Sequence, residues 1–101
     1  MVRLTDDQIH TLIEETQSCF GKTAQIWIFG SRTDDSKKGG DIDLYIETDL
    51  SEGLVAAKLK FRSLIWPQFG EQKIDILVRS RTKEMNPMHL IAKDSGQLLS
   101  P

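Results

Sequence analysis

The stretch that decides the fold is residues 40–47, which read GDIDLYIE. Apolar side chains recur at every second position, and this alternation predicts a β-strand over residues 41–47. Its core-facing side chains are Ile42, Leu44 and Ile46. Because successive side chains of a strand point to opposite faces, Asp41 and Asp43 share the other face. Two neighbouring carboxylates repel each other unless a cation lies between them, so the stretch predicts a divalent metal site.

A third carboxylate belongs to a later strand. Residues 73–78 read KIDILV, an apolar run that Asp75 interrupts, and they predict a strand. If this strand pairs with residues 41–47, three carboxylates converge, as two magnesium ions about 3.5–4 Å apart require for nucleotidyl transfer. Asp41 and Asp43 would then bridge both ions. Asp75 would complete one metal site and act as general base for the acceptor hydroxyl.

A small turn precedes the acidic strand. Residues 24–29 predict a strand that leads into Gly30 and Ser31, where backbone amides and a hydroxyl could bind phosphate. An ordinary tight turn is the alternative for these two residues. Arg32 follows directly, and its guanidinium could neutralise charge on a leaving pyrophosphate.

The rest of the chain predicts three helices. The first spans residues 5–20 and starts with a capping box of Thr5 and Gln8. The second runs from a cap at Ser51 to about residue 66 and ends at Pro67. The third begins at Asn86-Pro87 and contains Leu90, Ile91, Leu98 and Leu99. This order is typical of a single α+β domain over residues 1–101, with helices backing one face of a small sheet and the other face open.

Composition excludes several classes of protein. The 101 residues include 13 basic and 15 acidic ones, for a net charge of −2, so no overall basic field favours long nucleic acids. The sole cysteine, Cys19, cannot form an internal disulfide and is expected to be buried. Nothing resembles a signal peptide or a membrane span, so we expect a cytoplasmic protein without membrane contact.

For the remaining aromatic residues and for Glu47, the sequence predicts a place in the core or on the surface and no part in the site. The aromatic residues expected in the core are Trp27, Phe29, Phe61, Trp66 and Phe69. Tyr45 is expected on the open face of its strand, where it could touch a nucleotide, and Glu47 is interpreted as a solvated surface charge. Neither residue is assigned to the site.

Three segments together resemble a known family. Residues 29–32 (FGSR), 40–44 (GDIDL) and 74–76 (IDI) are similar to the minimal nucleotidyltransferases of the polymerase-beta-like superfamily. The resemblance implies a small mixed sheet backed by helices, magnesium-dependent use of ATP, and transfer of AMP to a hydroxyl. The residues that carry it are Gly30, Ser31, Asp41, Asp43 and Asp75. Residues 33–35 (TDD) depart from the pattern of many relatives and place acidic charge near the expected triphosphate.

The resemblance also implies a partner. Stand-alone domains of this family are usually antitoxins that form a hetero-oligomer with an all-helical HEPN-type ribonuclease toxin and attach AMP to one of its tyrosines. Two alternatives stay open at this point. The chain could silence its partner by binding and masking it without catalysis, or it could transfer a nucleotide to a small molecule with a partner chain completing the pocket.

Overall fold

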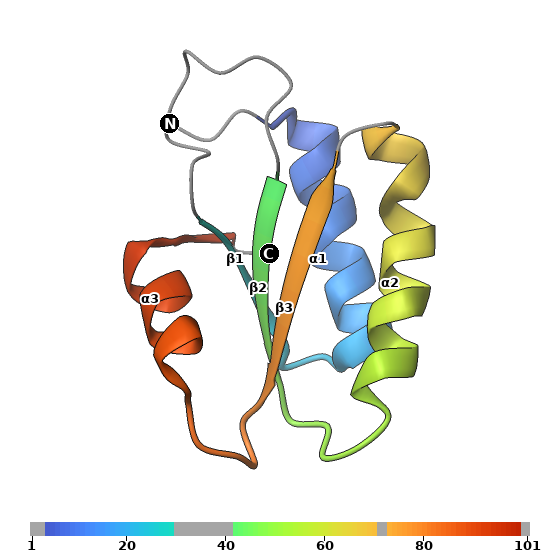
Figure 1. Cartoon of the computed structure of the whole chain (residues 1–101). Coiled ribbons are helices and arrows are strands. Elements are labelled where there is room, and N and C mark those ends of the chain that lie inside the picture. The colour runs from blue at the N-terminus through green and yellow to red at the C-terminus, as the bar shows by residue number, and fades with distance from the viewer. Residues whose placement is uncertain (1–3, 30–41, 71–72, 100–101) are drawn as a thin grey trace.

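The computed structural model describes residues 4–29, 42–70 and 73–99 (Figure 1). Three helices and four strands lie within these ranges. In chain order they are α1 (Asp6–Phe20), β1 (Gln25–Phe29), β2 (Ile42–Thr48), α2 (Leu54–Phe69), β3 (Ile74–Ser80), α3 (Pro87–Ser95) and β4 (Gln97–Leu99). This is the predicted α+β class, with one short strand added at the end of the chain.

The strands form one mixed sheet in the order β3-β2-β1-β4. β1 pairs antiparallel with β2 and with β4, while β2 and β3 run parallel. Parallel neighbours need a long crossover connection, and α2 provides it. The two aspartate-containing strands are thus neighbours, which is the pairing on which the predicted metal site depends.

The main core lies between the sheet and the helices α1 and α2, which lie side by side on one face (Figure 1). The alternating apolar residues of β2 point into this core, as predicted, and Leu44 and Ile46 are fully buried. Leu12 of α1 and Phe61 and Ile65 of α2 meet them from the helical side. Phe20 and Phe61 pack edge to face, with ring centroids 5.8 Å apart.

The second face of the sheet is not left open, which corrects the prediction. Helix α3 packs on this face (Figure 1). Trp27, Tyr45 and Ala92 form a second buried cluster there. The physical reason lies in β1 and β3: Phe29 and Leu77 also point to this face and pack against the cluster. A face that carries several large apolar side chains requires a cover.

The predicted start of α1 is confirmed in detail. Thr5 is the N-cap, its Oγ1 accepts a hydrogen bond of 3.1 Å from the Gln8 backbone N–H, and the Gln8 side chain accepts from the Thr5 N–H. Helix α2 differs from the prediction at both ends. Gly53, rather than Ser51, is its N-cap, with a positive φ of 74° that suits glycine. Pro67 lies inside the last turn and does not end the helix, because only one hydrogen-bond donor near the exposed helix end is lost there.

The end of the chain also differs from the prediction. Asn86 and Pro87 form the predicted cap and first position of α3, but the helix ends at Ser95, and Leu98 and Leu99 belong to β4. Gly96 explains the change of direction. A Cβ atom at this position would lie 2.5 Å from the Ala92 carbonyl oxygen and 3.1 Å from that of Ile28, so only glycine allows the chain to pass this close to β1.

Two residues, Trp66 and Cys19, are less buried than the sequence predicted. Trp66 is 54 % exposed on α2, whereas the other four aromatic residues of the predicted set are buried or half-buried. Cys19 is half-buried beside the core rather than inside it, and burial raises the pKa of its thiol. Among the described residues, no helix combines the length and the hydropathy needed to cross a membrane.

Candidate active site

Two of the three predicted metal ligands lie side by side. Asp43 is the second residue of β2 and Asp75 the second of β3, and the parallel register pairs them directly. Neighbouring strands are about 4.8 Å apart, so the two side chains leave the sheet within reach of a common ligand. The backbone holds this end of the strands together, since the Ile42 N–H donates to the Lys73 carbonyl oxygen at 2.9 Å.

The two carboxylates share the face that α3 partly covers. Their strand neighbours Ile42 and Ile74 point into the core below α1 and α2, so alternation directs Asp43 and Asp75 to the other face. Asp75 is exposed and Asp43 half-buried. Because both residues sit near the starts of their strands, they lie at the rim of the sheet, which leaves Asp75 open to solvent.

The other predicted site residues fall outside the described part of the chain. They are Gly30, Ser31, Arg32 and Asp41. Strand β1 ends at Phe29, which pairs with Asp43 in the register. Within residues 4–29, 42–70 and 73–99, no group of three histidine, cysteine, aspartate or glutamate side chains gathers to hold a metal ion. The described site is thus a pair of carboxylates, and the pair consists of hard oxygen donors that suit magnesium.

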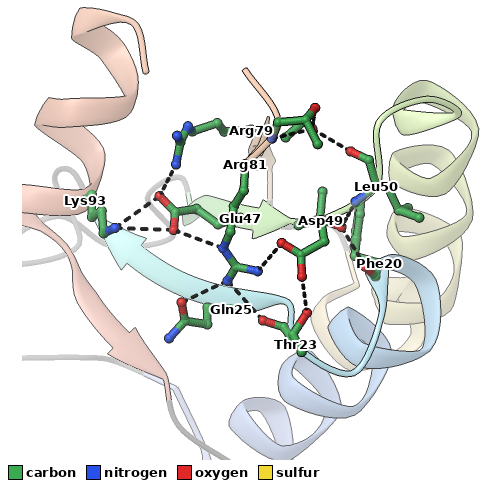
Figure 2. Close-up of polar contacts among 12 residues, drawn as sticks. Phe20, Thr23, Gln25, Glu47, Asp49, Leu50, Arg79, Arg81 and Lys93 are labelled. Carbon is green, nitrogen blue, oxygen red and sulfur yellow. Dashed lines mark hydrogen bonds and ion pairs between the residues drawn. The ribbon is translucent and has the colours of Figure 1, made fainter. Parts of the chain in front are cut away.

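A second cluster of charges lies near the far end of β2, and the sequence interpretation missed it. Glu47 is 2 % exposed, so it is not the solvated surface charge that was expected. Its Oε2 accepts hydrogen bonds from Tyr45 Oη at 2.6 Å and from Arg79 Nη1 at 3.1 Å. Lys93 of α3 lies 3.3 Å from both carboxylate oxygens, and Arg81 Nε lies 3.7 Å from Oε1 (Figure 2). We call these five residues, Tyr45, Glu47, Arg79, Arg81 and Lys93, the Glu47 cluster.

Burial and charge act in opposite directions on Glu47. Burial by itself would raise the pKa of this carboxyl group, but hydrogen bonds from Tyr45 and Lys93, together with Arg79, lower the pKa below its ordinary value. The pKa of Tyr45 is raised, first by burial and then by its hydrogen bond to Glu47. Glu47 is therefore an ionised carboxylate whose negative charge the protein itself neutralises.

The Glu47 cluster connects α3 to the C-terminal ends of β2 and β3. Lys93 contacts Glu47 and also lies 5.3 Å from the ring centroid of Trp27, a cation–π geometry. Arg81 extends the network away from α3 (Figure 2). It donates to the Thr23 carbonyl at 3.0 Å, to Gln25 Oε1 at 2.9 Å and to Asp49 Oδ1 at 3.1 Å. These contacts are those of a structural network.

Tyr45 does not face an open surface, which corrects its expected position. The ring is fully buried between Trp27, at 5.3 Å between centroids, and His89 of α3, at 5.8 Å. A nucleotide cannot reach it. The sequence of β1 contained a signal for this cover. Trp27 and Ile28 are consecutive apolar residues, so they point to opposite faces of the strand, and both faces need to be buried.

No protein-family model matches the chain, and no curated protein matches it significantly. The resemblance described for residues 29–76 therefore rests on the segments quoted for it.

Proposed function

We propose that this protein is a magnesium-dependent nucleotidyltransferase that moves AMP from ATP to a hydroxyl group of a partner protein. The observation that carries the proposal is the register pairing of Asp43 with Asp75 at the rim of the sheet. Two carboxylates in adjacent strands, on one face and open to solvent on one side, are two of the three protein carboxylates that such chemistry would use here. Asp41, two residues before Asp43, would complete the set.

The residues fit magnesium by the chemistry of their donors. Asp43 and Asp75 would hold the ions with Asp41, and bound magnesium would neutralise the triphosphate and lower the pKa of the acceptor hydroxyl. Asp75, as the exposed member, would accept the proton of that hydroxyl. The acceptor oxygen bonds to the α-phosphorus of ATP, the bond to the bridging oxygen breaks, and pyrophosphate leaves. Gly30, Ser31 and Arg32 would bind the leaving phosphates.

The position of α3 restricts where substrates bind. The helix covers Trp27 and Tyr45, in the middle of the face, so ATP and the acceptor must approach the aspartates from the rim. A domain of 101 residues with a net charge of −2 offers no extended basic groove for a polynucleotide acceptor. A protein hydroxyl, for which the family resemblance implies a tyrosine, is the acceptor that we propose. The partner would be a HEPN-type ribonuclease toxin, which the modification silences in the cytoplasm.

A second candidate function is masking of the partner by binding without catalysis. The observation that favours it is an exposed apolar stripe on α2, which includes Leu59 at 60 % and Trp66 at 54 % exposure. Large exposed apolar side chains in a row mark a protein interaction surface. This candidate does not need Asp43 or Asp75.

One experiment separates the two functions. The purified protein is mixed with ATP, magnesium and the product of the adjacent gene, and the intact mass of both chains is recorded. We expect the partner to gain whole AMP units with the wild-type chain and with Asp94→Asn, a control at an exposed aspartate of α3. The variant Asp43→Asn/Asp75→Asn should leave the partner mass unchanged. A stable complex whose mass never changes would refute catalysis on this partner and support masking.

A further inference from the structure

Helix α2 exposes an apolar stripe that the proposed chemistry does not use. Val55, Leu59 and Trp66 are 72 %, 60 % and 54 % exposed, although α2 already buries Phe61 and Ile65 in the core. We call the three exposed residues the α2 stripe. A helix that packs one face into its own domain and exposes a second apolar face is suited to a second contact.

The spacing of the stripe is that of a helix-packing seam. Positions 55, 59, 62 and 66 follow each other at intervals of four, three and four residues, so they lie along one line of the helix. Arg62 occupies the third of these positions. Leu59, Arg62, Ser63 and Trp66 line a hollow in the surface. The small Ser63 between two large side chains leaves space for an incoming side chain, as in knobs-into-holes packing.

The charge of α2 specifies what can occupy the stripe. The helix contains Lys58, Lys60 and Arg62 and no acidic residue between positions 54 and 69, although the whole chain has a net charge of −2. Among the residues that the structure describes, none of these three cations forms an ion pair. Two copies of the chain that met through α2 would therefore bring like charges together, which disfavours a symmetric dimer.

We propose that the α2 stripe binds an acidic amphipathic helix of a partner protein. The apolar side of that helix would pack on Val55, Leu59 and Trp66, with one side chain in the hollow, and its acidic residues would face Arg62, which lies within the row, and Lys58, which lies beside it. A membrane surface fits less well, because lipid does not need a hollow of this shape. The inference is independent of nucleotidyl transfer, since the aspartates do not take part in it.

The test uses two synthetic helical peptides with the same leucine seam, one flanked by glutamates and the other by lysines. Trp66 reports binding through its fluorescence, because the other tryptophan, Trp27, is 6 % exposed and already shielded from water. We expect the acidic peptide to shift the emission to shorter wavelength and to bind about tenfold more tightly than the basic one at low salt. Added salt should reduce this difference.

Two variants define the surface. Leu59→Asp should abolish binding of the acidic peptide, whereas Ile91→Asp, at an equally exposed apolar residue of α3, should bind it like the wild type. Circular dichroism confirms that both variants are folded. Equal affinity for the two peptides, or unchanged binding by Leu59→Asp, would overturn the proposal. So would an emission shift with anionic vesicles but not with the acidic peptide, or a dimer in sedimentation that Leu59→Asp dissociates.

Discussion

Strand β2 carries two carboxylates on the same face, four residues or about 13 Å apart, and the two differ in burial and in the residue that the register places beside them. Glu47 faces Tyr45, Arg79 and Lys93, and it is buried. Asp43 has the carboxylate of Asp75 as its neighbour across the register, at a rim where Asp75 is exposed. One register places both pairs, since the offset that aligns Asp43 with Asp75 also aligns Glu47 with Arg79.

We propose that the two ends of β2 serve different purposes, the Glu47 end a structural one and the Asp43 end a functional one. At the Glu47 end the protein supplies the positive charge, so the carboxylate stabilises the fold and joins α3 to the sheet. At the Asp43 end, the register places a second carboxylate, that of Asp75, beside Asp43 on the adjacent strand, and we propose that this pair serves to bind a cation. The predictions below test this contrast, beginning with the largest effect.

Asp75→Asn should reduce AMP transfer about 10²–10⁴-fold, because the variant loses a proton acceptor and a charged metal ligand. The free energy of unfolding without magnesium should stay within about 0.5 kcal/mol of wild type, as for exposed positions in general. Initial rates of partner modification and urea unfolding measure the two effects. Unfolding of the variant at much lower urea concentration would mean that Asp75 has a structural role instead.

Glu47→Gln should have its large effect on the free energy of unfolding instead of on AMP transfer. The change leaves Arg79 and Lys93 without their carboxylate, and loss of one member of a buried ion pair costs about 3 kcal/mol or more. Lys93 is 43 % exposed and can regain water, so we expect the lower end of that range. Urea unfolding measures it, with Glu84→Gln, an exposed glutamate, as the matched control. Equal midpoints for the two variants would contradict a structural role of Glu47.

The pH dependence of stability should identify Glu47 directly. Its pKa is lower in the folded chain than in the unfolded chain, so its stabilising effect is fully present above the unfolded pKa of about 4.3. The effect is lost as the pH falls through the lower, folded pKa. Between pH 5 and pH 3, wild type should therefore lose more stability than Glu47→Gln, by urea unfolding at each pH. Parallel curves would rule out this linkage.

Tyr45→Phe should be milder, at about 1.5 kcal/mol, because it removes the 2.6 Å hydrogen bond to Glu47 and keeps the ring contact with Trp27. The raised pKa of Tyr45 adds an alkaline signature. Its contribution is present below the unfolded pKa of about 10 and lost as the pH rises above it. Wild type should thus lose stability above pH 10 more steeply than the variant, and the opposite order would contradict the buried hydroxyl.

Asp49→Asn should have the smallest effect of the series. Asp49 contacts Arg81 at 3.1 Å and Thr23 at 2.6 Å, but its side chain is 62 % exposed, and solvent weakens such pairs. Its unfolding midpoint should lie close to that of wild type and well above that of Glu47→Gln. A loss of stability as large as that of Glu47→Gln would show that the exposed contacts of Asp49 are also needed to stabilise the fold.

The elements with regular patterns were predictable from sequence. Alternation in residues 41–47 predicted the strand that the structure has at Ile42–Thr48 and its buried face, and the Thr5–Gln8 capping box predicted the start of α1. Asp43 and Asp75 share a face of the sheet, because alternation fixes the face of Asp43 and a strand pattern fixes that of Asp75, and their role as metal ligands stays a prediction. The rest of the predicted site, including Asp41, lies outside the described residues.

The errors came from tertiary contacts. Local helix propensity predicted that the last helix includes Leu98 and Leu99. In the structure these residues pair with β1 as a strand, after Gly96 has brought the chain close to β1. A strand pattern for residues 43–47 does not show that α3 will bury Tyr45 or bring Lys93 to Glu47. The pairing of Glu47 with Arg79 could have been predicted from the sequence, because the strand register that pairs Asp43 with Asp75 also pairs Glu47 with Arg79.

The most direct test of the contrast is binding of Mn²⁺, a paramagnetic substitute for magnesium, to the isolated chain with ATP, followed by electron paramagnetic resonance. Wild type and Tyr45→Phe should bind the ion with similar affinity, and Asp75→Asn should bind it at least about tenfold more weakly. Unchanged binding by Asp75→Asn would contradict a metal site at the rim of β2 and β3, and loss of binding in Tyr45→Phe would place the site at the wrong end of the strand.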